Sequence, residues 1–112
     1  MGILVIREPA APSQIADMSA EFGNVIKLAV DLRRRILAGG GELHADCEQA
    51  LLDDGSRQED VWGGDWYPHL REVGFESLIN IRPRQGNHSL ALQSPELRQQ
   101  FEMIVRHLLE EA

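Results

Sequence analysis

The sequence predicts an α+β domain in which helices pack on a mainly antiparallel sheet of about five strands. Residues 73–82 alternate like a strand with one buried face, and residues 25–39 have the pattern of a β-hairpin. Residues 94–108 carry the apolar stripe of an amphipathic helix that ends the domain. The predicted order is β-α-β-β-α-β-β-α, within one globular domain that covers residues 1–112.

The first strand is expected at residues 2–6, which are short, apolar and partly β-branched. Two prolines then break the strand, and a helix is expected to begin at Pro12 and Ser13. Gly23 and Asn24 are suited to end this helix. Its apolar face carries Ile15, Met18 and Phe22.

Residues 25–41 fit two interpretations, because their apolar side chains match both a strand alternation and a helical spacing. We favour a hairpin of strands 25–32 and 36–39, since β-branched residues are frequent and three glycines follow. Residues 42–54 also fit an alternating strand, but we predict a helix that Gly55 ends.

The second half contains two further strands and the last helix. Residues 61–67 are expected to form a strand that is bent or bulged at Gly63 and Gly64. Strand 73–82 would pair near it and end at Pro83. Ser94 is a suitable N-cap for the helix, with Pro95 at its first position. The apolar stripe consists of Leu97, Phe101, Ile104, Val105 and Leu108.

Composition limits the function. The formal net charge of -7 argues against binding to nucleic acid or to anionic membranes, which need a positive surface. Cys47 is the only cysteine, so no intramolecular disulfide forms, as suits a reducing compartment. No window approaches the ~20 apolar residues of a membrane span, and the apolar run at residues 3–6 is too short for a signal peptide. We therefore expect a cytoplasmic protein.

Three segments agree in type and order: GGELHADCE, LLDDGS followed by QEDVWG, and ESLINIRPRQGN followed by a serine after one residue. They resemble a small bacterial family, frequent in cyanobacteria, that carries only a domain-of-unknown-function label. The resemblance runs from about Val25 to the last helix. It implies a compact α+β protein, favours the hairpin and the helix at 42–54, and brings no catalytic residues. Gly39–Gly41 depart from the family, where bulkier strand residues are expected.

One candidate site is the polar segment of Glu42, His44, Asp46 and Glu48. On a helix, His44 and Glu48 stand at i and i+4, a spacing at which two side chains can hold one metal ion. A neutral histidine beside a carboxylate can also act as a general base. The plainer interpretation is a solvated polar face, which we favour because no third strong ligand is apparent.

A second candidate is the loop after strand 73–82. Arginines bind carboxylates and phosphates in a bidentate manner, and aromatic side chains can anchor a partner protein. The plainer interpretation is that the arginines neutralise nearby acids, Asn87 stabilises a turn, and the aromatic residues 62, 66 and 67 seal a small core. The ligand-binding or partner-binding candidates are Arg82, Arg84, Asn80, Asn87, Trp62 and Trp66.

The leading hypothesis is a noncatalytic module that binds a partner protein, a second copy of itself, or a small anion through these side chains. No cofactor or metal is expected, and Cys47 is predicted to be a core residue. Replacing Arg82 and Arg84 together by alanine would leave folding intact and weaken the association. The alternative is a metal-assisted hydrolase, with His44, Asp46 and Glu48 as ligands or base and Arg82 holding an oxyanion.

Overall fold

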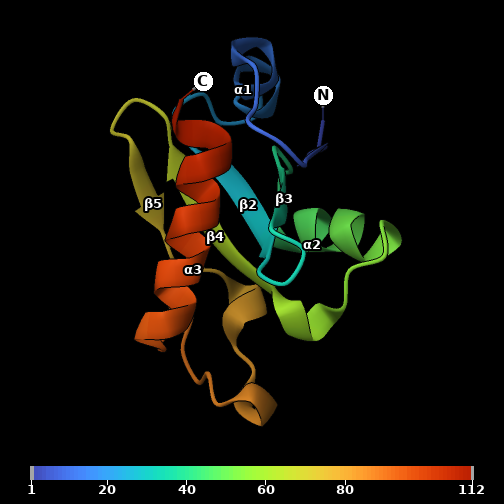
Figure 1. Ribbon diagram of the computed structural model, residues 1–112, viewed down its shortest axis with the longest axis vertical. Coiled ribbons are helices and arrows are strands. Elements are labelled where there is room, and N and C mark those ends of the chain that lie inside the picture. Colours follow the sequence, from blue (N-terminus) through green and yellow to red (C-terminus); the bar gives the residue numbers. More distant parts are fainter. Residues whose placement is uncertain (1, 112) are drawn as a thin grey trace.

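A five-stranded antiparallel sheet with helices on both faces forms the body of the protein (Figure 1). The computed structural model describes residues 2–111. The strands lie in the order β1-β3-β2-β4-β5, so the long β2 and β4 occupy the middle. The predicted fold class and element order are confirmed. The elements are β1 (Leu4–Ile6), α1 (Pro12–Met18), β2 (Ile26–Asp31), β3 (Ile36–Gly39), α2 (His44–Asp53), β4 (Val61–Tyr67), β5 (Glu72–Gly74) and α3 (Pro95–Val105).

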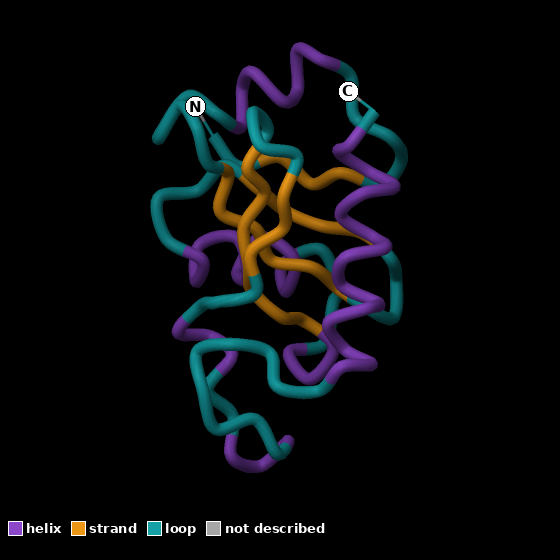
Figure 2. The backbone as a smooth tube through the Cα atoms, turned by 90° about the vertical axis from the view of Figure 1, so that its left-hand side faces the viewer, coloured by secondary structure: helices purple, strands orange, loops and turns teal. Residues whose placement is uncertain are grey.

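The sheet separates two apolar cores, because successive strand residues point to opposite faces. On one face, α1 and α3 cover the larger core, which includes Leu28, Trp66 and Phe101. On the other face, α2 covers a smaller core with Cys47 and Leu51 at its centre. Figure 2 shows the strands between these helical layers, with the loops of residues 75–94 at one end of the molecule.

The strand predicted at residues 73–82 is wrong beyond Gly74. β5 ends there, and a 3₁₀ turn covers Leu78–Asn80. The Ser77 hydroxyl accepts a hydrogen bond from the Ile79 N–H, which replaces a ladder partner with a local one. The alternation does not correspond to one buried face either, because Ile81 is 46% exposed.

The bend predicted at Gly63 and Gly64 is also wrong, since β4 pairs with β2 in continuous register from Val61 to Trp66. The glycines are needed for space. A Cβ on Gly63 would lie 2.6 Å from Ser77, and one on Gly64 would collide with the Gly74 carbonyl oxygen and the Phe101 ring. β4 therefore accepts a loop on one face and α3 on the other.

Helix α3 begins as the sequence predicts, with the Ser94 hydroxyl accepting a hydrogen bond from the Leu97 N–H. Phe101, Ile104 and Val105 are buried. After Val105 the helix continues as a π-helical turn, Arg106–Glu110, a departure from α geometry that is frequent at functional sites. No helix within residues 2–111 is long and apolar enough to cross a membrane.

Candidate functional site

Arg82 links the loops of residues 75–94 to the segment that enters β4. Its guanidinium donates hydrogen bonds to the carbonyl oxygens of Ile79, Gln58 and Val61, and it stacks 4.3 Å from the centre of the Trp62 ring. Burial lowers the pKa of this arginine, while the carboxylate of Glu48 acts in the opposite direction. These contacts occupy the guanidinium N–H donors that were expected, from the sequence, to bind an anion.

Asn80 joins the loops to the sheet. Its side chain is fully buried, accepts a hydrogen bond from the Gly63 N–H, and donates to the Gly63, Phe75 and Leu90 carbonyl oxygens. Two of these bonds reach the backbone of β4, which explains why the loop lies so close to Gly63. The asparagine thus replaces missing strand pairing with side-chain hydrogen bonds.

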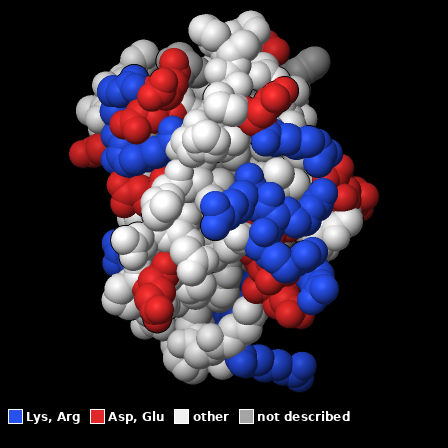
Figure 3. Space-filling view, in the orientation of Figure 1, with Lys and Arg blue, Asp and Glu red and all other residues white. Residues whose placement is uncertain are grey.

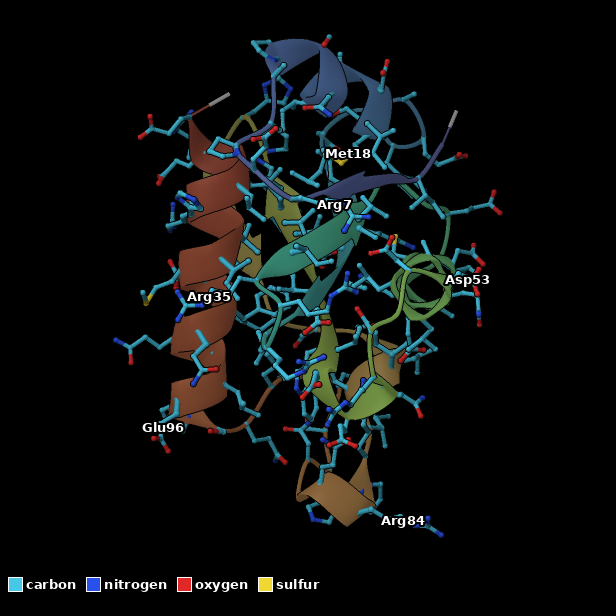
Figure 4. The ribbon with its side chains drawn as sticks, turned by 45° about the vertical axis from the view of Figure 1, so that its right-hand side comes forward. Arg7, Met18, Arg35, Asp53, Arg84 and Glu96 are labelled. Carbon is cyan, nitrogen blue, oxygen red and sulfur yellow. The ribbon has the colours of Figure 1, made fainter. Side chains whose placement is uncertain are left out.

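The remaining residues of the predicted binding surface do not lie together on one exposed face. Asn87 is buried and donates to the carbonyl oxygens of three loop residues, while Trp62 and Trp66 are each only 2% exposed in the larger core. Arg84 is exposed and points away from the body at the far end of the molecule (Figure 4). A surface that joins Arg82, Arg84 and the tryptophans is therefore not present.

Helix α2 directs its predicted metal ligands to different partners. His44 Nε2 lies 2.9 Å from Asp65 Oδ1 and 3.1 Å from the Gly64 carbonyl oxygen, so this nitrogen carries a proton. One turn later, Glu48 Oε2 lies 3.6 Å from Arg82 Nη2 and accepts no hydrogen bond within residues 2–111.

The other acids of this segment do not complete a metal site. Asp46 and Glu42 are exposed. No group of three or more His, Cys, Asp or Glu side chains within residues 2–111 has the geometry to hold a metal ion. The pair His44–Asp65 joins α2 to β4, and the pair Glu48–Arg82 joins α2 to the loop after β5.

Cys47 is a core residue between α2 and the sheet, where its thiol lies 3.4 Å from the Lys27 carbonyl oxygen. Burial raises the pKa of the thiol to about 11. Because the buried thiol stays neutral while an unfolded one ionises, its stabilising effect is complete below the unfolded pKa and is lost as the pH rises toward 11.

Unfolding experiments should therefore show a pH dependence that belongs to Cys47. Between pH 9 and 11 the free energy of unfolding is expected to fall by roughly 2 kcal/mol because of this group. Urea unfolding of the wild type and of Cys47→Ala at several pH values measures the difference. If the free energy of unfolding depends on pH equally in both proteins, the assignment to Cys47 is contradicted.

A groove beside α3 is a concave surface of a size that suits a small ligand. It consists of two adjoining hollows of about 350 and 330 Å³, with Leu32 and Gln100 lining both. We call the pair the α3 groove. The first hollow is lined by Leu32, Arg35, Gln100, Met103, Ile104 and His107. The second is lined by Leu32, Arg33, Glu59, Asp60, Trp62, Leu97, Gln85 and Gln100.

The wall opposite α3 is the turn between β2 and β3, which carries Arg33, Arg34 and Arg35 and is called the arginine turn here. Buried Asp31 fixes this turn, since its Oδ1 accepts hydrogen bonds from the Arg33 and Arg34 N–H groups at 2.9 Å. Arg35 has a φ of 58°, a left-handed conformation that is uncommon for a residue other than glycine. This conformation places Arg35 beside α3 (Figure 4).

The three arginines of the turn differ in their partners. Arg33 Nε lies 3.1 Å from Asp60, and Arg34 contacts Ser56 and Asp54. The side chain of Arg35 is exposed and makes no hydrogen bond or ion pair within residues 2–111. Arg35 is thus the arginine of the groove that is available to an anion.

This site was not predicted from the sequence. The run Arg33–Arg35 in the predicted hairpin turn was a visible signal, but the opposite wall comes from Met103 and Ile104 on α3. Their convergence depends on how α3 crosses the sheet, which local spacing does not reveal. The π-helical turn that carries His107 into the groove was also not predicted from the sequence.

The fold and groove define a small α+β protein with an antiparallel sheet, helices on both faces, and a groove between a hairpin turn and the last helix. The chain belongs to the family described as Protein of unknown function (DUF5674), whose model matches residues 4–108. The expected membership in a domain-of-unknown-function family is confirmed. Comparison with curated proteins and with solved structures finds no match.

Proposed function

We propose that this protein is a noncatalytic binding module that holds a segment of a partner protein in the α3 groove. The observation that carries the proposal is the exposed guanidinium of Arg35 next to the apolar side chains of Leu32 and Ile104. A cation beside apolar surface suits a ligand group that has a carboxylate on an apolar body.

The dimensions of the groove support this role. Each hollow is near the lower end of the ~300–1,000 Å³ range of ligand pockets, so one hollow suits one side chain. Met103 is 62% exposed on the same wall, and methionine adapts its shape to different apolar partners.

The proposal keeps the class of function expected from the sequence and moves its surface from Arg82 to Arg35. The cytoplasm remains the proposed location, because the only cysteine is a buried thiol. The arrangement of α2 lends no support to the metal-assisted alternative, since His44 and Glu48 turn toward different partners.

Isovalerate tests the proposal as a minimal probe with a branched apolar body and a carboxylate. Ligand-detected saturation-transfer NMR should show binding with a Kd on the order of 1–10 mM. Isoamylamine, which has a similar skeleton and the opposite charge, should bind at least several-fold more weakly.

Arg35→Asn removes the cation and keeps a residue that tolerates positive φ. We expect it to weaken isovalerate binding about tenfold. Arg71→Asn is the control matched in backbone conformation, because Arg71 also has a positive φ, at 55°, in the turn between β4 and β5, where its side chain donates to the Glu110 carbonyl oxygen. Equal loss in both variants, or unchanged binding in Arg35→Asn, would overturn the proposal.

A further inference from the structure

The chemistry of the partner segment follows from the charges around the α3 groove, and this step rests on the function proposed above. Arginines are concentrated near the arginine turn although the chain has a net charge of -7. Figure 3 shows Lys and Arg side chains gathered over this part of the face.

The contacts of Asp54 show how the basic surface extends beyond the turn. Arg7 and Arg34 both pair with Asp54, whose pKa is lowered to about 2 by hydrogen bonds from Arg7 and then Arg34. Two arginines therefore share one carboxylate. Exposed Arg57 follows directly after Ser56, which Arg34 also contacts. The basic surface is defined here as Arg7, Arg34, Arg35 and Arg57.

The two hollows of the groove differ in charge, which gives it a direction. The first contains Arg35 and His107 beside apolar side chains, whereas the second contains Glu59 and Asp60 together with Arg33 and Gln85, so that its carboxylates outnumber its arginine. Asp60 is already paired with Arg33, but Glu59 is exposed. A carboxylate is favoured at the first hollow, and a hydrogen-bond donor or a cation at the second.

The length of the groove indicates whether its ligand is a compact anion or an extended peptide. Its wall on α3 runs from Leu97 to His107, which corresponds to about 15 Å at 1.5 Å per residue. An extended chain covers this distance with about five residues at ~3.3 Å each. A short extended peptide therefore spans both hollows, whereas a compact anion fills only one.

We infer that the α3 groove takes an extended segment of a partner protein in which acidic residues precede an apolar side chain. The acidic residues lie against Arg35 and the other arginines of the basic surface. The apolar side chain enters the first hollow, and the polar end of the segment reaches Glu59. The juxtaposition of Arg35 with the apolar wall of α3 and the opposite charge of the second hollow carry this inference.

Fluorescence anisotropy with a labelled peptide tests the inference. The probe is the peptide Glu-Asp-Leu-Ser-Lys with blocked ends, and its matched control is Gln-Asn-Leu-Ser-Lys. We expect the acidic peptide to bind about tenfold more tightly at low salt. Its advantage should shrink at 0.5 M NaCl, since exposed charges are screened.

Two protein variants locate the effect. Arg35→Asn should reduce the advantage of the acidic peptide to about twofold or less, whereas Arg71→Asn should leave it unchanged. Equal affinities of the two peptides for the wild type would overturn the inference. If isovalerate still binds through Arg35 in that case, the proposed function stands and only the partner chemistry fails. A protein that is already a dimer, and that the acidic peptide neither binds nor dissociates, would instead point to a second copy in the groove and would also overturn the inference.

Discussion

Asn80→Ala is expected to lower the free energy of unfolding by about 3–5 kcal/mol. The substitution removes four hydrogen bonds at a fully buried position and leaves the Gly63 N–H and three carbonyl oxygens without their side-chain partner. Each buried group left unsatisfied costs ~1–3 kcal/mol, and the costs are not additive. Thermal unfolding should show a fall in Tm of about 15 °C or more.

A matched control separates this effect from the loss of any asparagine. Asn24 is exposed and its side chain makes no hydrogen bond within residues 2–111, so Asn24→Ala should change stability by less than ~0.5 kcal/mol. Asn80→Asp keeps the size of the side chain and removes its donors, so it should destabilise the protein at neutral pH as well. A stable Asn80→Asp protein would show that packing, rather than hydrogen bonding, holds the loops.

Arg82→Ala is expected to destabilise the protein by about 3–5 kcal/mol, because it breaks a buried ion pair and several hydrogen bonds together. The loss leaves the Glu48 carboxylate without its cation and removes the link between Ile79, Gln58 and Val61. This expected loss replaces the prediction from the sequence that substituting Arg82 and Arg84 together leaves folding intact. Urea unfolding gives the measurement.

The exposed Arg84 offers the control for Arg82. Arg84→Ala should be nearly neutral, since its side chain points away from the body (Figure 4). Adding Glu48→Gln to Arg82→Ala should recover part of the lost stability, because it removes the uncompensated buried charge. If Arg82→Ala unfolds at the same urea concentration as the wild type, Arg82 does not organise the loops.

The elements that the sequence predicted correctly are those whose signal is local. The cap at Ser94 and the stripe through Phe101 specify α3, and the β-branched alternation with a following glycine run specifies the hairpin of β2 and β3. The predicted strand 73–82 failed because Ser77 and Asn80 supply hydrogen bonds from their side chains. A strand alternation does not show whether ladder partners exist.

The candidate site was less predictable, and the reason is physical. Asn80 and Arg82 were recognised as special residues, but their partners lie on distant elements, so a binding role and a structural role look the same in the sequence. The α3 groove contains both Leu32, which follows β2, and Met103, which lies on α3. Only the packing of α3 brings these side chains together.

The α3 groove, rather than the face of α2, is proposed to receive the ligand. Amide chemical shifts of the labelled protein during titration with isovalerate test it most directly. We expect saturable changes at Leu32, Arg35 and Gln100, with the amides of α2 unaffected. Changes centred on His44 and Glu48, or none at a concentration of 20 times the Kd measured by saturation transfer, would contradict it.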